Sequence, residues 1–363
     1  HNIANSVVIL DEAQMMPVDF LKPCLHAIEQ LVHYYGCTVV LCSATQPELG
    51  RYLQNSPIEI MENVGELFQF FKRVTFDIDG ETDYAEIAKK LDECEQVLCI
   101  ASTKKEAEKI FELLDGEAMY LSTNLCPAHR REIIREMKTR LRDGKPCRVV
   151  STSIISVGVD IDFPVVYRQE AGLDSLLQAA GRCNREGKRE LGTTYVFSLS
   201  KEHNLPKGDM QDANNARLNL GNQPDWFAPS TMSAYFKQLY GRKNSFDVSD
   251  MKHYLYSSKD IYFETAAKKF QLIEDNGTNV VVCWEDSMEL VQQLLEHGPS
   301  YTLVKKLSKY MVNVKPTDFK ALVDMGVVSE KWEGFYVIDY KQQYDEHIGL
   351  RTDNNWANEI QII

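Results

Sequence analysis

Two acidic residues near the start of the chain could take part in phosphate chemistry. Asp11 and Glu12 follow the apolar run Val-Val-Ile-Leu, which predicts a buried strand over residues 7–10. Open parallel sheets place ligand-binding residues just past the carboxyl ends of their strands. In an ATP site the first carboxylate holds magnesium, usually through water, and the second orients and deprotonates the attacking water. A solvated loop or helix N-terminus explains the same pair equally well.

Two small hydroxyl residues follow the next apolar run, residues 38–42. Ser43 and Thr45 stand at the end of a strand, a short distance from the acidic pair, and this placement suits a hinge that senses the nucleotide state. Their alternative role is to cap whatever helix follows.

Three long polar side chains, Gln178, Arg182 and Arg185, are spaced at i, i+4 and i+7. A helix would align them on one face, and we expect one over residues 175–183. Arginines at this spacing can reach across a cleft to stabilise the charge that develops on a transferred γ-phosphate. Gly181 inside such a helix costs about 1 kcal/mol relative to alanine. A glycine there indicates close backbone approach, which favours this role over a solvated basic face.

Further polar residues at predicted strand ends could hold a nucleic acid or a nucleotide. Thr152 closes one strand, and Ser102 and Thr103 follow another, just before a predicted helix. Hydroxyls in such places can bind a sugar-phosphate backbone, although N-capping explains Ser102 and Thr103 without any ligand. Gly158 and Asp160 lie in the turn after Thr152. The Asp160 carboxylate could contact a ribose hydroxyl, or it could contact Arg182 and Arg185.

A phosphate-binding loop is absent from this set. The pattern Gly-x-x-x-x-Gly-Lys-Ser/Thr, whose backbone cradles the phosphates of a bound nucleotide, occurs nowhere in the 363 residues. The chain therefore carries the later parts of an ATP site without its first part, and alone it is expected to be inactive.

The composition is that of a folded acidic protein. With 44% hydrophobic and 26% charged residues the chain predicts two or three domains. Its net charge of -13 means that any nucleic-acid contact must come from a local groove. Nine cysteines without a Cys-x-x-Cys pair, no signal peptide and no membrane-spanning run predict a cytoplasmic protein without a zinc site. An opening on His1 rather than Met suggests a chain that begins inside a longer protein or was trimmed.

Apolar strands alternate with helices over the first 200 residues, which predicts parallel sheets in two successive open α/β units, the first incomplete. We expect strands at 7–10, 38–42, 96–101, 118–121, 148–151, 165–168 and 194–197, and helices at 17–35, 104–114, 128–142 and 175–183. Residues 50–76 show no clear period.

The remainder has a different character. Residues 203–229 are rich in Asn, Asp, Gly and Pro and predict a linker, followed by a helix over 260–273 with Ile261 and Ile273 among its apolar residues. The tail predicts a small α+β domain with β-like runs at 280–284, 301–304, 310–314 and 335–338. Its aromatic residues are interleaved with lysines, which suits a lid or docking module, although each aromatic alone is as easily a core residue. These aromatics are Tyr301, Tyr310, Trp332, Phe335 and Tyr336.

Four runs resemble motifs II, III, V and VI of superfamily 2 helicases in order and spacing. They are Asp-Glu-Ala-Gln at 11–14, Ser-Ala-Thr at 43–45, Ser-Thr-Ser-Ile-Ile-Ser-Val-Gly-Val-Asp at 151–160 and Gln-Ala-Ala-Gly-Arg-Cys-Asn-Arg at 178–185. With Leu-Ser-Thr at 121–123, these runs most resemble the helicase-nuclease of type I CRISPR systems, strongly over about residues 1–200.

The resemblance implies a domain order. It implies the end of a first RecA-like domain over 1–67, a complete second RecA-like domain over 68–200, a linker and helix over 201–276, and an α+β accessory domain over 277–363. The family's N-terminal nuclease domain would precede the chain, which contains no His-Asp dipeptide. Neither a nuclease nor a complete ATPase is therefore encoded here.

The resemblance also implies a function for the parent protein, namely ATP- and Mg²⁺-dependent translocation on single-stranded DNA after recruitment by an RNA-guided surveillance complex. Catalysis would fall to Asp11, Glu12, Arg182 and Arg185. Nucleotide contacts would come from Asp11, Gln14, Gly158, Asp160 and Gln178. Contact with nucleic acid and coupling to it would come from Ser43, Thr45, Ser102, Thr103, Thr123 and Thr152.

Two alternatives stay open. The chain could act by itself as a non-enzymatic module that binds DNA, the surveillance complex or a protein inhibitor. It could also belong to an unrelated superfamily 2 helicase that acts on DNA or RNA.

Overall fold

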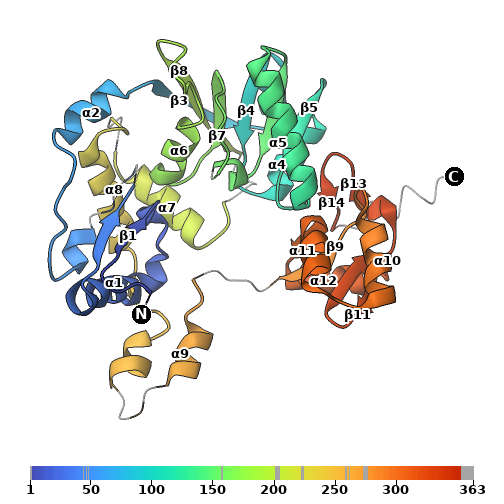
Figure 1. The fold of residues 1–363 in the computed structure, drawn as a ribbon. Coiled ribbons are helices and arrows are strands. Elements are labelled where there is room, and N and C mark those ends of the chain that lie inside the picture. Colours follow the sequence, from blue (N-terminus) through green and yellow to red (C-terminus); the bar gives the residue numbers. More distant parts are fainter. Residues whose placement is uncertain are drawn as a thin grey trace. The chain divides into compact units, whose positions relative to one another are not determined.

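The structure, a computed structural model, shows two compact units (Figure 1). It describes residues 2–43, 45, 47, 49–156, 158–200, 205–221, 225–257, 260, 262–272 and 277–352. Unit 1 comprises His1–Lys72, Ala171–Gln178 and Leu205–Glu274, and unit 2 comprises Arg73–Glu170, Ala179–Asn204 and Asp275–Ile363. Both contain parallel sheet and flanking helices, so the expected α/β class is confirmed. Within the described residues, no helix is long and apolar enough to cross a membrane.

Unit 1 begins with two parallel strands joined by a helix. The order is β1 (Val7–Leu10), a 3₁₀ turn (Val18–Phe20), α1 (Leu21–Tyr35) and β2 (Thr38–Leu41). Leu10 lies opposite Leu41, so both strands end at the same level. α1 ends at Gly36, which adopts φ +63° and donates its N–H to the Leu31 carbonyl, a left-handed cap that glycine takes without strain. The expected strand, helix and strand form, but β1 is not buried as expected, since Val7 is 66% and Ile9 64% exposed.

More helices complete unit 1. They are α2 (Val64–Phe70), α7 (Asp209–Leu218), α8 (Pro229–Gly241) and α9 (Phe263–Lys269), with a π-helical turn at His253–Ser257. Its core joins α1 to α8 and to the first turn of α6 (Leu173–Ala180), through Leu21, Leu25, Leu173, Tyr235 and Phe236.

The linker prediction for 203–229 is wrong where α7 forms. This helix buries only Asn214 and Ala216, so no apolar period marks it. The helix expected over 260–273 is shorter in the structure. Ile261 and Ile273, like the first two residues of the predicted linker, lie outside the described residues.

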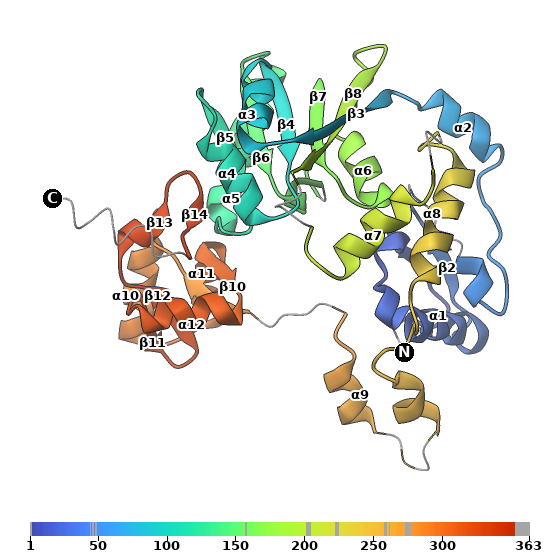
Figure 2. The ribbon, with the colours of Figure 1, turned by 180° about the vertical axis from the view of Figure 1, so that it is seen from behind.

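Unit 2 is organised around six parallel strands in the order β3-β8-β7-β4-β6-β5 (Figure 2). They are β3 (Val74–Thr82), β4 (Gln96–Ile100), β5 (Ala118–Leu121), β6 (Cys147–Ser151), β7 (Val165–Gln169) and β8 (Gly192–Leu199). The central strands β4, β6 and β7 are largely buried on both faces, as in sheets covered by helices on both sides. The expected strands from β4 to β8 are confirmed.

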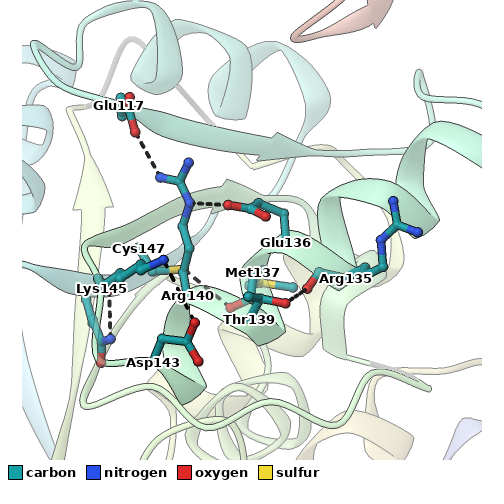
Figure 3. A network of polar contacts seen from close by, with 10 residues as sticks. Glu117, Arg135, Glu136, Met137, Thr139, Arg140, Asp143, Lys145 and Cys147 are labelled. Atoms are coloured by element: carbon teal, nitrogen blue, oxygen red, sulfur yellow. Dashed lines mark hydrogen bonds and ion pairs between the residues drawn. The ribbon is translucent and has the colours of Figure 1, made fainter.

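Helices α3 (Tyr84–Asp92), α4 (Lys104–Glu112) and α5 (Pro127–Arg142) connect these strands. An ion-pair network ties the end of α5 to the start of β5 (Figure 3). Arg140 lies 2.7 Å from Glu136 through Nε and 3.0 Å from Glu117 through Nη1. Such exposed pairs each contribute roughly 0–1 kcal/mol, so Arg140 links the helix to the sheet edge with only a small gain in stability.

The C-terminal part of unit 2 is an α+β module, as expected. Its sheet has the order β10-β9-β12-β11. The strands are β9 (Thr278–Val281), β10 (Met311–Val314), β11 (Val328–Trp332) and β12 (Phe335–Ile338), and the helices are α10 (Ser287–His297), α11 (Tyr301–Leu307) and α12 (Pro316–Asp324). A separate pair, β13 (Tyr344–Asp345) and β14 (Gly349–Leu350), follows.

Two expectations for this module need correction or refinement. The β-like run at 301–304 is wrong, because Ser300 accepts the Leu303 N–H at 3.2 Å and starts a helix there. Of the interleaved aromatics, Tyr310 is buried and Phe335 and Tyr336 pack on the core, whereas Tyr301 is 83% exposed.

Candidate nucleotide and nucleic-acid sites

The acidic pair sits on a turn pinned to the ends of both strands of unit 1. The Ala13 N–H donates to the Cys42 carbonyl at 3.0 Å, and the Cys42 N–H donates to Leu10 at 2.9 Å. Asp11 and Glu12 are both exposed. Glu12 adopts φ +54°, a left-handed conformation that costs a non-glycine residue about 1–2 kcal/mol. The fold thus holds two carboxylates in solvent at the carboxyl end of a parallel strand.

A chain of side-chain hydrogen bonds runs from this turn to the second motif. Gln14 donates to the Glu12 carboxylate, and Ser43 donates to the Gln14 carbonyl oxygen. The Ser43 hydroxyl also accepts the Thr45 N–H at 3.1 Å. The structure therefore brings together the predicted residues Glu12, Gln14, Ser43 and Thr45.

Among the described residues, the helical turn that follows Ser43 and Thr45 starts at Leu49. Ala44, between the two hydroxyl residues, lies outside the described residues. Thr45 is buried, and its hydroxyl has no hydrogen-bond partner among the described residues. A buried hydroxyl without a hydrogen-bond partner costs free energy. Such unsatisfied groups are found at sites where strain serves a function.

Gln178 belongs to the same unit. It lies near the end of α6, with its amide nitrogen 4.0 Å from the Met15 sulfur, next to the acidic turn. Among the predicted nucleotide contacts, Asp11, Gln14 and Gln178 thus share unit 1.

The two arginines do not continue the helix of Gln178, which corrects the expected i, i+4, i+7 face. α6 ends at Ala180, and Arg182 then donates its N–H back to Ala179 at 2.9 Å. The chain turns again at Asn184, which adopts φ +46°. Gly181 follows the helix instead of lying inside it. Its cost inside a helix therefore no longer favours a phosphate-binding role of the arginines over a solvated basic face.

This arginine turn, residues 181–185, is held against residues 156–162 of the same unit. Arg182 is buried and donates to the Ser156 carbonyl. Arg185 donates through Nε to Asp160 at 2.7 Å and through its backbone N–H to Asp162 at 2.6 Å. Asp160 therefore contacts Arg185, one of the two contacts expected for it. Gly158 in this loop is exposed with φ +72°.

Asn184 is a positioning residue that sequence reasoning missed. It is fully buried, and its amide donates to the carbonyls of Arg73 at 3.1 Å and Arg189 at 2.8 Å. Asparagine tolerates the left-handed conformation better than most residues. A Cβ on Gly192 would lie 2.8 Å from that of Asn184, so a glycine is required beside it. The run Cys-Asn-Arg-Glu-Gly was the available signal, because asparagine and glycine together mark a turn.

The predicted nucleic-acid residues of unit 2 line one edge of its sheet. β6 lies between β4 and β5, with Ser151 opposite both Ile100 and Leu121. Adjacent strands lie about 4.8 Å apart, so the residues that follow these three ends are neighbours. They include Ser102, Thr123 and Thr152.

Thr103 is engaged within the protein. Its hydroxyl accepts the Glu106 N–H at 3.2 Å and donates to the Glu106 carboxylate at 2.7 Å, the arrangement of an N-cap. Glu106 in turn accepts from Gln169, whose amide oxygen receives the Ser102 N–H at 2.8 Å. Thr103 therefore orients the strand-end loop through Glu106 and Gln169.

A magnesium ion fits one feature of unit 1. Asp11 offers an exposed carboxylate, one oxygen of which accepts the Glu12 N–H at 3.0 Å. Magnesium retains several waters and takes one or two carboxylates plus substrate phosphates, so a single protein ligand is compatible with it. No cluster of three or more potential ligands occurs in the described part of the chain.

Comparison with known proteins points to one group. Residues 93–188 match the family described as CRISPR-associated nuclease/helicase Cas3, C-terminal. A CRISPR-associated nuclease/helicase Cas3 of Haloferax volcanii is 37% identical over 91 residues, which are 24% of this chain and 10% of that protein. The Cas3 of Methanothermobacter thermautotrophicus is 24% identical over 196 residues, 49% of this chain and 24% of that protein.

Solved structures show the same fold. The crystal structure of T. fusca Cas3 superposes with a TM-score of 0.61 at 14% identity, over 92% of this chain and 50% of that one. A structure titled CRISPR RNA-guided surveillance complex, pre-nicking, matches with a TM-score of 0.53 at 13% identity, over 91% of this chain and 53% of that one. This chain thus spans about half of the solved chains. Over residues 93–188 in sequence, and over most of its length in fold, the chain is thus similar to the C-terminal portion of CRISPR-associated nuclease/helicases Cas3.

Proposed function

We propose that the chain forms part of an ATP-dependent translocase that moves on single-stranded DNA during CRISPR interference. The observation that carries this proposal is the hydrogen-bonded chain from Glu12 through Gln14 and Ser43 to Thr45. It connects a carboxylate suited to phosphate hydrolysis with a strand end that can respond to the nucleotide. We keep the division into domains at 1–67, 68–200, 201–276 and 277–363 as part of this proposal.

Each catalytic residue has a distinct role in the proposed reaction. Glu12 orients the attacking water and takes its proton. Asp11 holds magnesium through water, and the ion when bound neutralises charge on the phosphates. Arg182 and Arg185 stabilise the negative charge that develops on the γ-phosphate. Arg185 is the more available of the two, since its side chain is 46% exposed and bonds at the surface to Asp160 and to the Gly181 carbonyl, whereas Arg182 is buried.

The remaining residues bind nucleotide and DNA. Gln14, Gln178, Gly158 and Asp160 are proposed as nucleotide contacts. Ser102, Thr123 and Thr152 are proposed to contact the DNA backbone, which gives little sequence preference. Thr103 then acts as a positioning residue, in keeping with its capping bonds.

The surveillance complex is the proposed protein partner. The matched structure whose title names such a complex supports this. The second candidate is a stand-alone role in binding DNA, the complex or an inhibitor. It stays open because the 363 residues lack the loop Gly-x-x-x-x-Gly-Lys-Ser/Thr, called the lysine loop below, that would hold the β- and γ-phosphates.

Phosphate release by the purified chain with single-stranded DNA separates the two roles. We expect hydrolysis no faster than background for the chain alone, and restored hydrolysis when a polypeptide with the lysine loop is supplied upstream. Robust turnover by the chain alone that disappears in Glu12→Gln would overturn the prediction. Binding without restored hydrolysis would favour the stand-alone module.

A further inference from the structure

The strand pair β13–β14 lies against the loop at residues 122–126, between β5 and α5. Both views of the ribbon place this pair beside α4 and α5 (Figures 1 and 2). The Leu350 N–H donates to the Asn124 carbonyl at 2.9 Å. Two segments more than two hundred residues apart in sequence are thus joined through their backbones.

Gly349 brings the two backbones together. It adopts φ +83°, and a Cβ placed on it would lie 2.4 Å from the Asn124 carbonyl oxygen and 2.9 Å from the Leu125 nitrogen. Both contacts are with backbone, which cannot swing aside as a side chain does. Only glycine therefore permits this approach.

Tyr344 fixes the other end of the same loop. Its hydroxyl accepts the N–H of Cys126, the N-cap residue of α5, at 3.0 Å. The hydroxyl also lies 3.0 Å from Nδ1 of His129, whose ring stacks on Trp284 with centroids 3.8 Å apart. Burial lowers the pKa of His129 to about 4, so the ring is neutral at pH 7 and Nδ1 can accept the hydroxyl proton.

The loop is also held from the side of α4. Lys104 donates to the Asn124 side-chain oxygen at 2.7 Å. Burial, and then the positive charge of Lys315 at the start of α12, lower the pKa of Lys104. Lys104 therefore places a cation beside the loop that carries the exposed Thr123.

We propose that β13–β14 clamps this loop in the conformation that binds single-stranded DNA, with Gly349 and Tyr344 as positioning residues for Thr123. The inference rests on the proposed function of that loop. It gives the C-terminal module a role besides the lid or docking role expected from the sequence, since the module sets the shape of a contact that belongs to the six-stranded sheet.

Gly349→Ala in the full 363-residue chain tests the clamp, with Gly334→Ala as the matched control. The two glycines have similar φ angles, +83° at Gly349 and +76° at Gly334, but a Cβ at Gly334 meets nothing within 4 Å. Backbone strain is therefore similar, and only Gly349→Ala pushes on the loop. Hydrogen exchange of the 121–126 amides and the affinity for a fluorescent oligo-dT are measured for both variants.

We expect Gly349→Ala to speed exchange of these amides and to weaken oligo-dT binding, each by roughly fivefold to tenfold, the size of one lost hydrogen bond. Gly334→Ala should change neither. Tyr344→Phe keeps the ring and should speed exchange of the Cys126 amide alone. Equal exchange at 121–126 in the two glycine variants would overturn the clamp.

Thr123→Ala separates this proposal from the proposed function. If that variant binds oligo-dT as the wild type does, the DNA role of the loop fails, and with it the clamp as a DNA-positioning device. If Thr123→Ala weakens binding while Gly349→Ala speeds exchange without weakening it, the DNA role stands and the clamp is overturned.

Discussion

Acidification should destabilise unit 2 through His129. The imidazole is 4% exposed, stacked on Trp284 and hydrogen-bonded to Tyr344. Burial lowers its pKa from 6.5 to about 4. Between these two values the unfolded chain binds the proton and the folded chain does not, so the free energy of unfolding falls as the pH drops from 6.5 towards 4.

The magnitude follows from the width of that window. A shift of about 2.5 pKa units, at about 1.4 kcal/mol per unit, corresponds to about 3 kcal/mol of stability lost on full acidification. This is a large part of the roughly 5–15 kcal/mol by which proteins of this kind are stable. Most of the loss should be present at pH 4.5.

Urea unfolding at pH 7 and pH 4.5 measures this loss, with His129→Phe as the test variant. Phenylalanine keeps the stacking on Trp284 but cannot titrate, so the loss should shrink by about 2–3 kcal/mol in the variant. His297→Phe is the control, because His297 is 74% exposed. If His129→Phe loses as much stability on acidification as the wild type, or an NMR titration finds His129 protonating near 6.5, the reasoning is refuted.

Three further perturbations test other parts of the structure. Thr103→Ala removes the N-cap of α4 and should lower the free energy of unfolding by about 1 kcal/mol, whereas Thr103→Ser should not; equal denaturation curves would contradict this. Asn184→Ala removes the side-chain bonds to the Arg73 carbonyl and to the carbonyl and N–H of Arg189, and it puts alanine at φ +46°. It should cost about 2–4 kcal/mol in urea unfolding, and a loss below about 0.5 kcal/mol would show that the turn holds without it. With the lysine loop supplied, Arg185→Ala should lower ATP turnover by about 10³-fold with nearly unchanged ATP affinity. Equal losses in both would mark it as a ground-state ligand.

Much of the α/β core could be predicted from the sequence, because buried parallel strands are near-continuous apolar runs bounded by hydroxyl and turn residues. β4, β6 and β7 are such runs. β1 is an apolar run too, but Val7 and Ile9 are exposed, so the expected burial of this strand is wrong. β3 was missed because Asp77 and Asp79 interrupt it. α7 was missed because it is polar almost throughout.

The candidate sites were partly predictable for the same reason. Strand ends meet at one edge of a parallel sheet, so Ser102 and Thr152 could be placed at that edge from their positions after predicted strands, whereas Thr123 came from the family resemblance. The arginine turn could not be predicted in this way, because the helical period of 3.6 residues fits the spacing of Gln178, Arg182 and Arg185 whether or not the helix continues. The bonds of Asn184 depend on Arg73, more than a hundred residues away, and no local pattern contains them.

The most direct test of the central claim is single-stranded-DNA-stimulated ATP hydrolysis by a polypeptide that supplies the lysine loop upstream of His1. We predict that stimulated phosphate release falls by about 10³-fold or more in Glu12→Gln, while ATP still binds, because the carboxylate acts on the attacking water. Stimulated hydrolysis that is unchanged in Glu12→Gln would contradict the assignment of this chain to an ATP-driven translocase.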